Sequence, residues 1–269
     1  MKIHSLSLIK NEVDIIAQSL RAAAKWSDNI FVLDNGSTDG TWERVLELAR
    51  DIPRLIPVGC DPRPYRNQMR LELLSQYRAS ASDGDWWCIL DADEIYIDNP
   101  RSFLSAIPDE FQAVEAQEFA YLFTDKDLKV FRQDPLLFDN ESPIERRLRF
   151  YASPDHSEAR FARHSENVGE IGFHLLRPVY PRRIRAKHFQ YRSPTQIQKR
   201  LETRRDAMQR GLFRHEKRGY WATGVLVPGP ASTEEIPERW EERIVNSELL
   251  NYDAGNGIYA EGKPWLPPE

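Results

Sequence analysis

Strand-like and helix-like stretches alternate along the first hundred residues, and this order restricts the fold more than any other feature of the chain. Residues 3–9 (IHSLSLI) repeat with a period of two, as a strand with one buried face does. Apolar side chains then recur at helical spacing between Val13 and Ala23, and the short apolar run NIFVL follows at 29–33. Successive strand–helix units pair as a mostly parallel sheet with helices on both faces. We therefore predict an α/β, Rossmann-like fold.

The alternation continues to about residue 110 and then becomes irregular. Asn99 followed by Pro100 is typical of the N-cap and first residue of a helix. The other elements that we expect are helices near 42–49, 65–80 and after Ser193 and Pro194, strands at 54–58, 86–90 and 114–123, and a loop-rich insertion at 124–145. The chain has no internal repeat and no low-complexity linker, so we predict one domain with parts at 1–110, 111–218 and 219–269.

The composition is that of an ordinary globular protein, since 41% of the 269 residues are hydrophobic and 29% are charged. A net charge of −5 argues against a nucleic-acid partner. The apolar runs are shorter than the roughly 18 residues of a membrane span, and the start MKIH does not lead into a signal-peptide core. Cys60 and Cys88 form no CxxC pair, and Cys88 is expected to be a reduced core residue. We expect a cytoplasmic protein.

Three acids within four residues follow the apolar run WWCIL, namely Asp91, Asp93 and Glu94. Like charges this close repel one another, and burying them is costly. A metal ion, an arginine, or water at a loop tip would each compensate them. Two further polar clusters, at 10–12 (KNE) and 34–37 (DNGS), also follow predicted strands. Because ligands of parallel sheets bind beyond the carboxyl ends of the strands, we expect the three clusters to line one crevice.

Asp91 and Asp93 are one residue apart, so both carboxylates can point at one ion where the chain turns. Oxygen ligands favour Mg²⁺ or Mn²⁺, and such sites often include substrate phosphates. This pattern suits a metal that is held through a nucleotide diphosphate and neutralises a leaving phosphate. Asp34 ends a buried run and can accept a hydrogen bond from a base, whereas Asp39 is the expected N-cap of the next helix.

The stretches LIKNE, IFVLDNGSTDGT, YRNQMR and WWCILDADEIY together resemble the family 2 glycosyltransferases, which have the GT-A fold. They occur in the family's order over roughly residues 1–100. The resemblance implies an inverting transfer of a sugar from a nucleotide sugar, most commonly a UDP-sugar, to an acceptor hydroxyl. It makes 1–110 the donor half and 111–218 the acceptor-side, metal-completing half. It also implies a surface polysaccharide or lipid-linked glycan as acceptor, with peripheral contact at the inner face of a membrane.

The donor-binding residues follow from this resemblance by position. Glu12 and Asp34 would contact the base and ribose, and Arg66 with Asn67 matches the family's Arg-Asn pair beside the donor. Many members carry two aspartates where this chain has Asp34 and Asn35. The first acid is present, so we retain the base contact.

The metal ligands follow from the resemblance in the same way. Asp91 and Asp93 match the family's DxD, with Asp93 the direct ligand and Asp91 also facing the donor. The later segment KHFQYRSPTQIQKR looks like a His-plus-Tyr-Arg-Ser segment of some bacterial members. His188 would complete the metal shell, and Arg192 would meet the diphosphate.

Inversion by direct displacement needs a base that takes the acceptor proton. In the family's order this base lies between the DxD and the late histidine. Glu166 is our first choice, and Glu94 beside the metal is a further candidate. Glu145, Asp155 and His164 also qualify by position.

Two other functions remain open at this point. A sugar-phosphate nucleotidyltransferase also uses a carboxylate-bound metal, but it usually has a glycine-rich basic loop after the first strand, where this chain has KNE. A degenerate GT-A fold that serves as a binding module is the third reading, and the intact acids Asp34, Asp91 and Asp93 argue against it.

Overall fold

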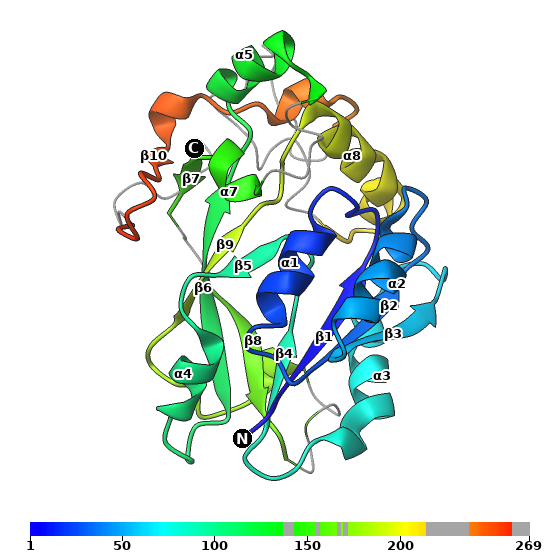
Figure 1. Cartoon of the computed structure of the whole chain (residues 1–269), viewed down its shortest axis with the longest axis vertical. Coiled ribbons are helices and arrows are strands. Elements are labelled where there is room, and N and C mark those ends of the chain that lie inside the picture. Colours follow the sequence, from blue (N-terminus) through cyan, green and yellow to red (C-terminus); the bar gives the residue numbers. More distant parts are fainter. Residues whose placement is uncertain (137–142, 154–156, 166–167, 169–171, 214–236, 260–269) are drawn as a thin grey trace. The chain divides into compact units, whose positions relative to one another are not determined.

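The computed structural model describes the chain except residues 137–142, 154–156, 166–167, 169–171, 214–236 and 260–269 (Figure 1). The chain forms two compact units. The first comprises Met1–Glu118 and His156–Lys187, and the second comprises Phe119–Asp155 and His188–Glu269.

A sheet in the order β3-β2-β1-β4-β8-β6 forms the centre of the first unit. Its strands are β1 (Ile3–Ile9), β2 (Asn29–Asp34), β3 (Leu55–Cys60), β4 (Trp86–Ile89), β6 (Ala113–Tyr121) and β8 (Ser157–Arg163). Strand β1 pairs in parallel with β2 and β4, and β2 pairs in parallel with β3. Strand β8 is antiparallel to both β4 and β6. Off this path, the short strand β5 (Glu94–Tyr96) pairs with β9 (Ile184–His188).

Helices cover both faces of this sheet because successive strand residues point to opposite sides. The helical elements of the unit are α1 (Ile16–Ala23), α2 (Thr41–Asp51), α3 (Gln68–Tyr77), η1 (Arg78–Ser80), α4 (Pro100–Ser105) and η2 (Phe173–Leu175). Helices α1, α2 and α4 contribute to one hydrophobic cluster, which includes Trp86 of β4. Helix α3 contributes to a second cluster, which includes the next strand residue, Trp87. The predicted α/β fold with a parallel core is confirmed.

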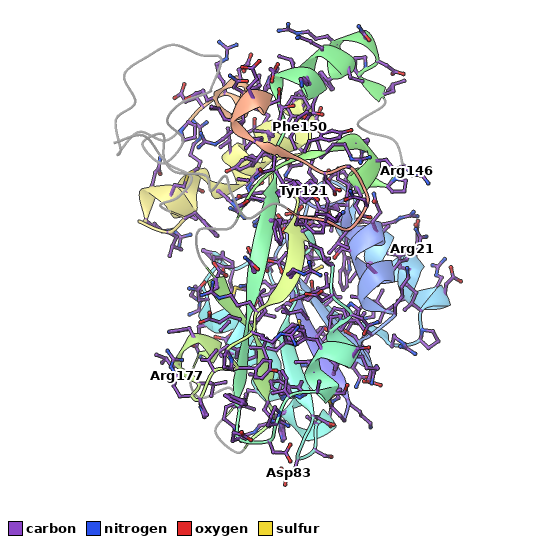
Figure 2. The ribbon with its side chains drawn as sticks, turned by 90° about the vertical axis from the view of Figure 1, so that its left-hand side faces the viewer. Arg21, Asp83, Tyr121, Arg146, Phe150 and Arg177 are labelled. Carbon is purple, nitrogen blue, oxygen red and sulfur yellow. The ribbon has the colours of Figure 1, made fainter. Side chains whose placement is uncertain are left out.

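The second unit contains the end of β6, which pairs antiparallel with β7 (Phe150–Ala152), and β10 (Asn251–Tyr252), which pairs with β7. Figure 2 labels Tyr121 on β6 and Phe150 on β7. The Tyr121 hydroxyl donates to Asp253 Oδ2 at 2.5 Å, which ties β6 to the segment after β10. The helical elements are α5 (Asp125–Gln133), α7 (Ile144–Arg147), α8 (Pro194–Gln209), η5 (Trp240–Arg243) and η6 (Ser247–Leu249). No helix among the described residues has the length and apolar character needed to cross a membrane.

Two helix starts agree with the sequence prediction, and two local predictions were wrong. Asn99 accepts from the Ser102 N–H, and Ser193 accepts from the Gln196 N–H, as N-caps do. The expected loop-rich insertion at 124–145 instead contains α5, which starts at a capping box of Thr124 with Asp127. Asp39 is not the N-cap of α2, because Gly40 takes that position with a φ of 94°.

Candidate active site

Three loops leave the first unit's sheet at the carboxyl ends of neighbouring strands. They follow β4, β1 and β2, which are adjacent in that order and mutually parallel. These loops carry the acids after β4, the KNE segment at 10–12 and the DNGS segment at 34–37. The sheet order therefore brings the three polar clusters to one edge, as the sequence predicted.

The loops after β1 and β2 are hydrogen-bonded to each other. The Asn11 N–H donates to Ser37 Oγ at 2.9 Å, and Asn11 Oδ1 accepts from the Thr38 N–H at 2.8 Å. One residue on, the Glu12 N–H donates to Thr41 Oγ1 at 2.8 Å. Asn11 has a φ of 55°, a left-handed conformation that asparagine tolerates better than most residues. These bonds make the two loops one continuous rim of the site.

Asp34 is the last residue of β2, and the two oxygens of its carboxylate have different surroundings. Oδ1 accepts from the backbone N–H groups of Gly36 at 2.8 Å and Ser37 at 2.7 Å, which closes the turn after the strand. Oδ2 is buried and receives no hydrogen bond from the described part of the chain. Leaving a buried carboxylate oxygen without a donor is costly, so this oxygen is suited to accept from a ligand.

Cys60 lies beside Asp34, since the two residues are partners in the pairing of β2 with β3. Burial of its sulfur and the negative charge of Asp34 raise the pKa of the Cys60 thiol. The residue as a whole is exposed, whereas Cys88 is fully buried, and both are free cysteines. A reagent that reaches thiols from solvent should therefore distinguish the two.

Asn35 explains why an amide stands where many family members are expected to have a second aspartate. Its Nδ2 donates to the carbonyl oxygens of Asp61 at 2.7 Å and of Arg63 at 2.8 Å, and the residue is only 2% exposed. A carboxylate has no hydrogen to donate to either carbonyl. The amide therefore holds the loop after β3 against the loop after β2.

The acids after β4 are compensated by arginines. Asp91 Oδ2 accepts from Arg160 Nη1 at 3.0 Å, and its Oδ1 accepts from Arg70 Nη2. Arg160 comes from β8, and its side chain is only 4% exposed. The same guanidinium also contacts the carboxylates of Glu94, Glu118 and Glu158. Of the three compensating groups considered from the sequence, the structure contains the arginine.

The electrostatics of both arginines follow from these contacts. Burial by itself lowers the pKa of Arg160, but the surrounding carboxylates, led by that of Glu94, outweigh it and raise the pKa well above the usual value. Arg70 shows the same balance, with burial opposed chiefly by Asp91 and a net raised pKa. Both side chains therefore carry a full positive charge in the site.

The residues predicted to contact the donor occupy different positions in the first unit. Glu12 is half-buried in the rim. Arg66 is half-exposed and pairs with Glu72 of α3 at 3.3 Å. Asn67 is the residue before α3, and its Oδ1 accepts from the Tyr65 hydroxyl at 2.7 Å. Neither Arg66 nor Asn67 has a described contact with Asp91.

The remaining predicted residues fall in several places. Asp93 and Glu94 are buried in the first unit, at 6% and 1% exposure. His188 is the last residue of β9 and belongs to the second unit. Arg192, also in the second unit, is buried and donates from Nη1 to the Phe189 carbonyl at 2.8 Å. Glu166 lies outside the described residues, as does Asp155.

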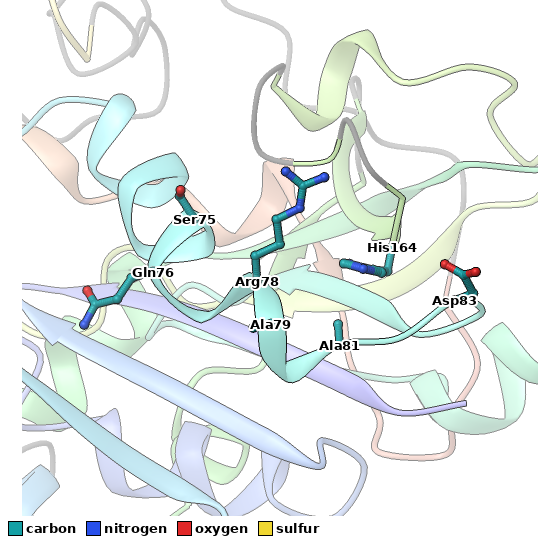
Figure 3. A pocket seen from close by; sticks show the side chains of 7 residues that line it. All are labelled: Ser75, Gln76, Arg78, Ala79, Ala81, Asp83 and His164. Atoms are coloured by element: carbon teal, nitrogen blue, oxygen red, sulfur yellow. The ribbon is translucent and has the colours of Figure 1, made fainter.

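His164 lies at the opposite end of the sheet from Asp91. It follows Arg163, which pairs with the first residue of β4, whereas Asp91 follows the end of that strand. His164 Nδ1 accepts from Trp87 Nε1 at 3.1 Å. The histidine helps to line a shallow pocket of about 450 Å³ together with Ser75, Gln76, Arg78, Ala79, Ala81 and Asp83 (Figure 3). This pocket is therefore separate from the strand-end site.

The carboxylates after β4 are suitable ligands for a hard divalent cation, with one restriction. Asp91 and Asp93 supply the carboxylate oxygens that Mg²⁺ and Mn²⁺ prefer. Both oxygens of Asp91, however, are held by guanidinium groups. Asp93 is therefore the better candidate for a direct ligand, and Asp91 would have to exchange an arginine for the ion.

Sequence reasoning missed Arg70, Arg160 and Glu118. Arg70 lies in the quoted segment YRNQMR, of which only Arg66 and Asn67 were given a role, so its place in that segment was a usable signal. Arg160 and Glu118 lie in strands far along the chain, and no local pattern indicates that they meet the DxD.

Comparisons with known proteins agree with the family resemblance. Residues 8–101 match the sequence model described as Glycosyl transferase family 2. A search of curated protein sequences gave no match.

Similar solved structures include two crystal structures of S. aureus TarS. One is 18% identical, with 46% of this chain and 22% of that chain covered and a TM-score of 0.31. The other, TarS 1–349, is 13% identical, with 75% and 63% covered and a TM-score of 0.38. The chain thus spans less than two thirds of the length of both TarS chains.

A third similar structure is the mannosyltransferase PcManGT from Pyrobaculum calidifontis in complex with GDP-Man and Mn²⁺, at 13% identity and a TM-score of 0.43, with 90% of this chain and 69% of that chain covered. The match of the sequence model agrees with the predicted enzyme class. Residues 8–101 of this chain match the glycosyl transferase family 2 model, in agreement with the family that the sequence motifs resemble.

Proposed function

We propose that this chain transfers a sugar from a nucleotide-diphosphate sugar to an acceptor hydroxyl, with inversion and with Mn²⁺ or Mg²⁺ as cofactor. We take a UDP-sugar as the expected donor, and a glycan or lipid-linked glycan as the acceptor. The family match of residues 8–101 supports the reaction class. Residues 1–110, which contain the three strand-end loops, are the proposed donor half.

The observation that carries the proposal is the buried Oδ2 of Asp34. Its partner oxygen is fully used by the turn, and Oδ2 receives no donor from the described residues. Uracil and guanine each have a ring N–H that can donate a hydrogen bond to such an oxygen. Asp34 lies at the carboxyl end of a parallel strand, where ligands of this sheet type bind.

The other residues receive roles that suit their positions. Glu12, Arg66 and Asn67 would help to hold the donor, and Asp93 would hold the cation. His188 and Arg192 keep the roles that the family resemblance implies for them, as a metal ligand and a diphosphate contact. When bound, the divalent cation would neutralise charge on the leaving diphosphate. Glu166 is the proposed base that takes the acceptor proton, and Glu94 is its alternative.

The nucleotide contact is tested with Asp34→Asn. This change keeps an oxygen for the two backbone donors but can place an NH₂ group where Oδ2 was, so that a donor faces the base. Affinity for UDP or GDP, measured by calorimetry, should fall about tenfold to hundredfold. Asp39→Asn is the matched control, because Asp39 lies in the same loop and accepts from Thr41. Equal affinities for the wild type and Asp34→Asn would remove Asp34 from the donor site.

Cys60 provides an independent readout of the same site. Bound nucleotide should slow alkylation of Cys60 by iodoacetamide, and the buried Cys88 serves as the unreactive internal reference. If no nucleoside diphosphate protects Cys60 or binds in calorimetry, the donor assignment fails.

Turnover of nucleotide sugars with and without Mn²⁺ separates the proposed reaction from its alternatives. A glycosyltransferase releases the nucleoside diphosphate, whereas a sugar-phosphate nucleotidyltransferase exchanges a nucleoside monophosphate unit. A binding module would bind nucleotide and release nothing. The free state of Cys60 and Cys88 is consistent with the proposed cytoplasmic location, and a lipid-linked acceptor would bring the enzyme to the inner face of the membrane.

A further inference from the structure

The two arginines that hold Asp91 are anchored to different degrees. Arg160 uses Nε, Nη1 and Nη2 in hydrogen bonds to carboxylates, and its side chain is 4% exposed. Arg70 uses Nη2 on Asp91, and its side chain is 22% exposed. The Arg70 Nε–H is buried and has no hydrogen-bond partner among the residues that the structure describes.

This difference makes Arg70 the displaceable partner of Asp91. A guanidinium with a buried, unsatisfied N–H has lost hydration without full compensation, so its present position is less favourable than that of Arg160. Withdrawing Arg70 leaves Asp91 still bonded to Arg160, whereas withdrawing Arg160 would remove a positive charge that Asp91, Glu94 and Glu118 share.

The charges of the groups around Arg160 also favour displacement of Arg70 by a cation. Arg160 contacts four carboxylates, those of Asp91, Glu94, Glu118 and Glu158, and Arg70 shares the first of them. Acids thus outnumber bases among these groups, and Arg70 supplies one of the two positive charges. A divalent cation that approaches Asp91 is repelled by the positive charge of Arg70. It must therefore bind against this repulsion or displace the Arg70 side chain.

We propose that Arg70 is a positioning residue that neutralises Asp91 and competes with a divalent cation for this carboxylate. The competition makes cation binding weaker than the acids alone would allow. It also couples cation binding to the release of the Arg70 side chain from Asp91. The inference rests on the proposed function only in that the site meets a divalent cation.

The test measures Mn²⁺ alone, by isothermal calorimetry and by the electron paramagnetic resonance of free Mn²⁺, on the full chain without nucleotide. A neighbouring charge shifts the proton affinity of a carboxylate by about one to three powers of ten. By the same interaction, Arg70→Met should tighten Mn²⁺ binding about tenfold or more. If Arg70→Met impairs folding, Arg70→Gln is the second variant. Arg70→Lys retains the charge, so it should tighten Mn²⁺ binding less than either of these variants.

Arg63→Met is the matched control for a lost charge. Arg63 precedes the same helix, α3, but pairs with Asp61 and Glu72, so its removal should change Mn²⁺ affinity far less. Adding Asp91→Asn to Arg70→Met should abolish the gain, because the contested carboxylate is then absent.

Four results would overturn the proposal: equal effects of Arg70→Met and Arg63→Met, weaker Mn²⁺ binding by Arg70→Met than by the wild type, a gain that survives Asp91→Asn, or failure of every form to bind Mn²⁺. In the last case, nucleotide protection of Cys60 would show that the proposed donor site still stands.

Discussion

Replacement of Asn35 by aspartate tests whether the loops after β2 and β3 are joined by the amide of this side chain. Asn35 Nδ2 lies 2.7 Å and 2.8 Å from the carbonyl oxygens of Asp61 and Arg63. The assignment of nitrogen to this position is fixed by its two acceptor neighbours. Asn35→Asp changes few atoms, yet it replaces a double donor by an acceptor at a residue that is 2% exposed.

The expected cost depends on pH. An ionised carboxylate facing two carbonyl oxygens would be a buried charge without compensation, which costs about 3–5 kcal/mol. The new acid avoids part of this cost by binding a proton, so its pKa in the folded state lies above the unfolded value. The protonated form donates to one carbonyl and loses about one hydrogen bond, or roughly 1–2 kcal/mol. Stability of the variant should therefore rise as the pH falls through the raised pKa.

Urea unfolding of wild type and variant at pH 5 and pH 8 measures this difference. We expect Asn35→Asp to be destabilised at both values and more strongly at pH 8. Asn99→Asp is the control, because Asn99 uses its side-chain oxygen to accept from Ser102 N–H, and aspartate caps a helix equally well. If Asn35→Asp is as stable as wild type at pH 8, or if its loss does not depend on pH, the reasoning is wrong.

Three further changes test other parts of the chain. Gly36→Ala should destabilise the fold more than Gly84→Ala, because both glycines have positive φ values but only at Gly36 would a Cβ meet a neighbour, 3.3 Å away; equal losses in thermal unfolding would contradict this. Burial raises the pKa of Asp127 to about 6, so this group should lower stability by at most about 3 kcal/mol as the pH rises from about 4 to about 6; the stability difference between wild type and Asp127→Asn should change with pH by this amount, and a difference that does not depend on pH would refute the raised pKa. Glu166→Gln should lower turnover about 10²–10⁴-fold with donor affinity nearly unchanged, and near-normal turnover would move the base to another residue.

Much of the first unit could be predicted from the sequence because its signals are local and periodic. The alternation of strand and helix patterns predicted the parallel core, and the rule for ligand sites in such sheets predicted that the loops after β1, β2 and β4 would meet. The helix starts at Asn99 and Ser193 were predictable because a cap and the backbone N–H that donates to it lie within four residues. Helix α5 was missed although its capping box, Thr124 with Asp127, is also local.

The compensation of the acids after β4 was decided by the tertiary structure. The sequence indicated that the negative charge of Asp91 must be compensated. It left open whether a metal ion, an arginine or water does so. Strand β8 lies antiparallel beside β4, and this pairing brings Arg160 to Asp91 across 69 positions of the chain. An ion pair between distant residues leaves no periodic trace in the sequence, because its energy depends on distance and burial in the folded chain.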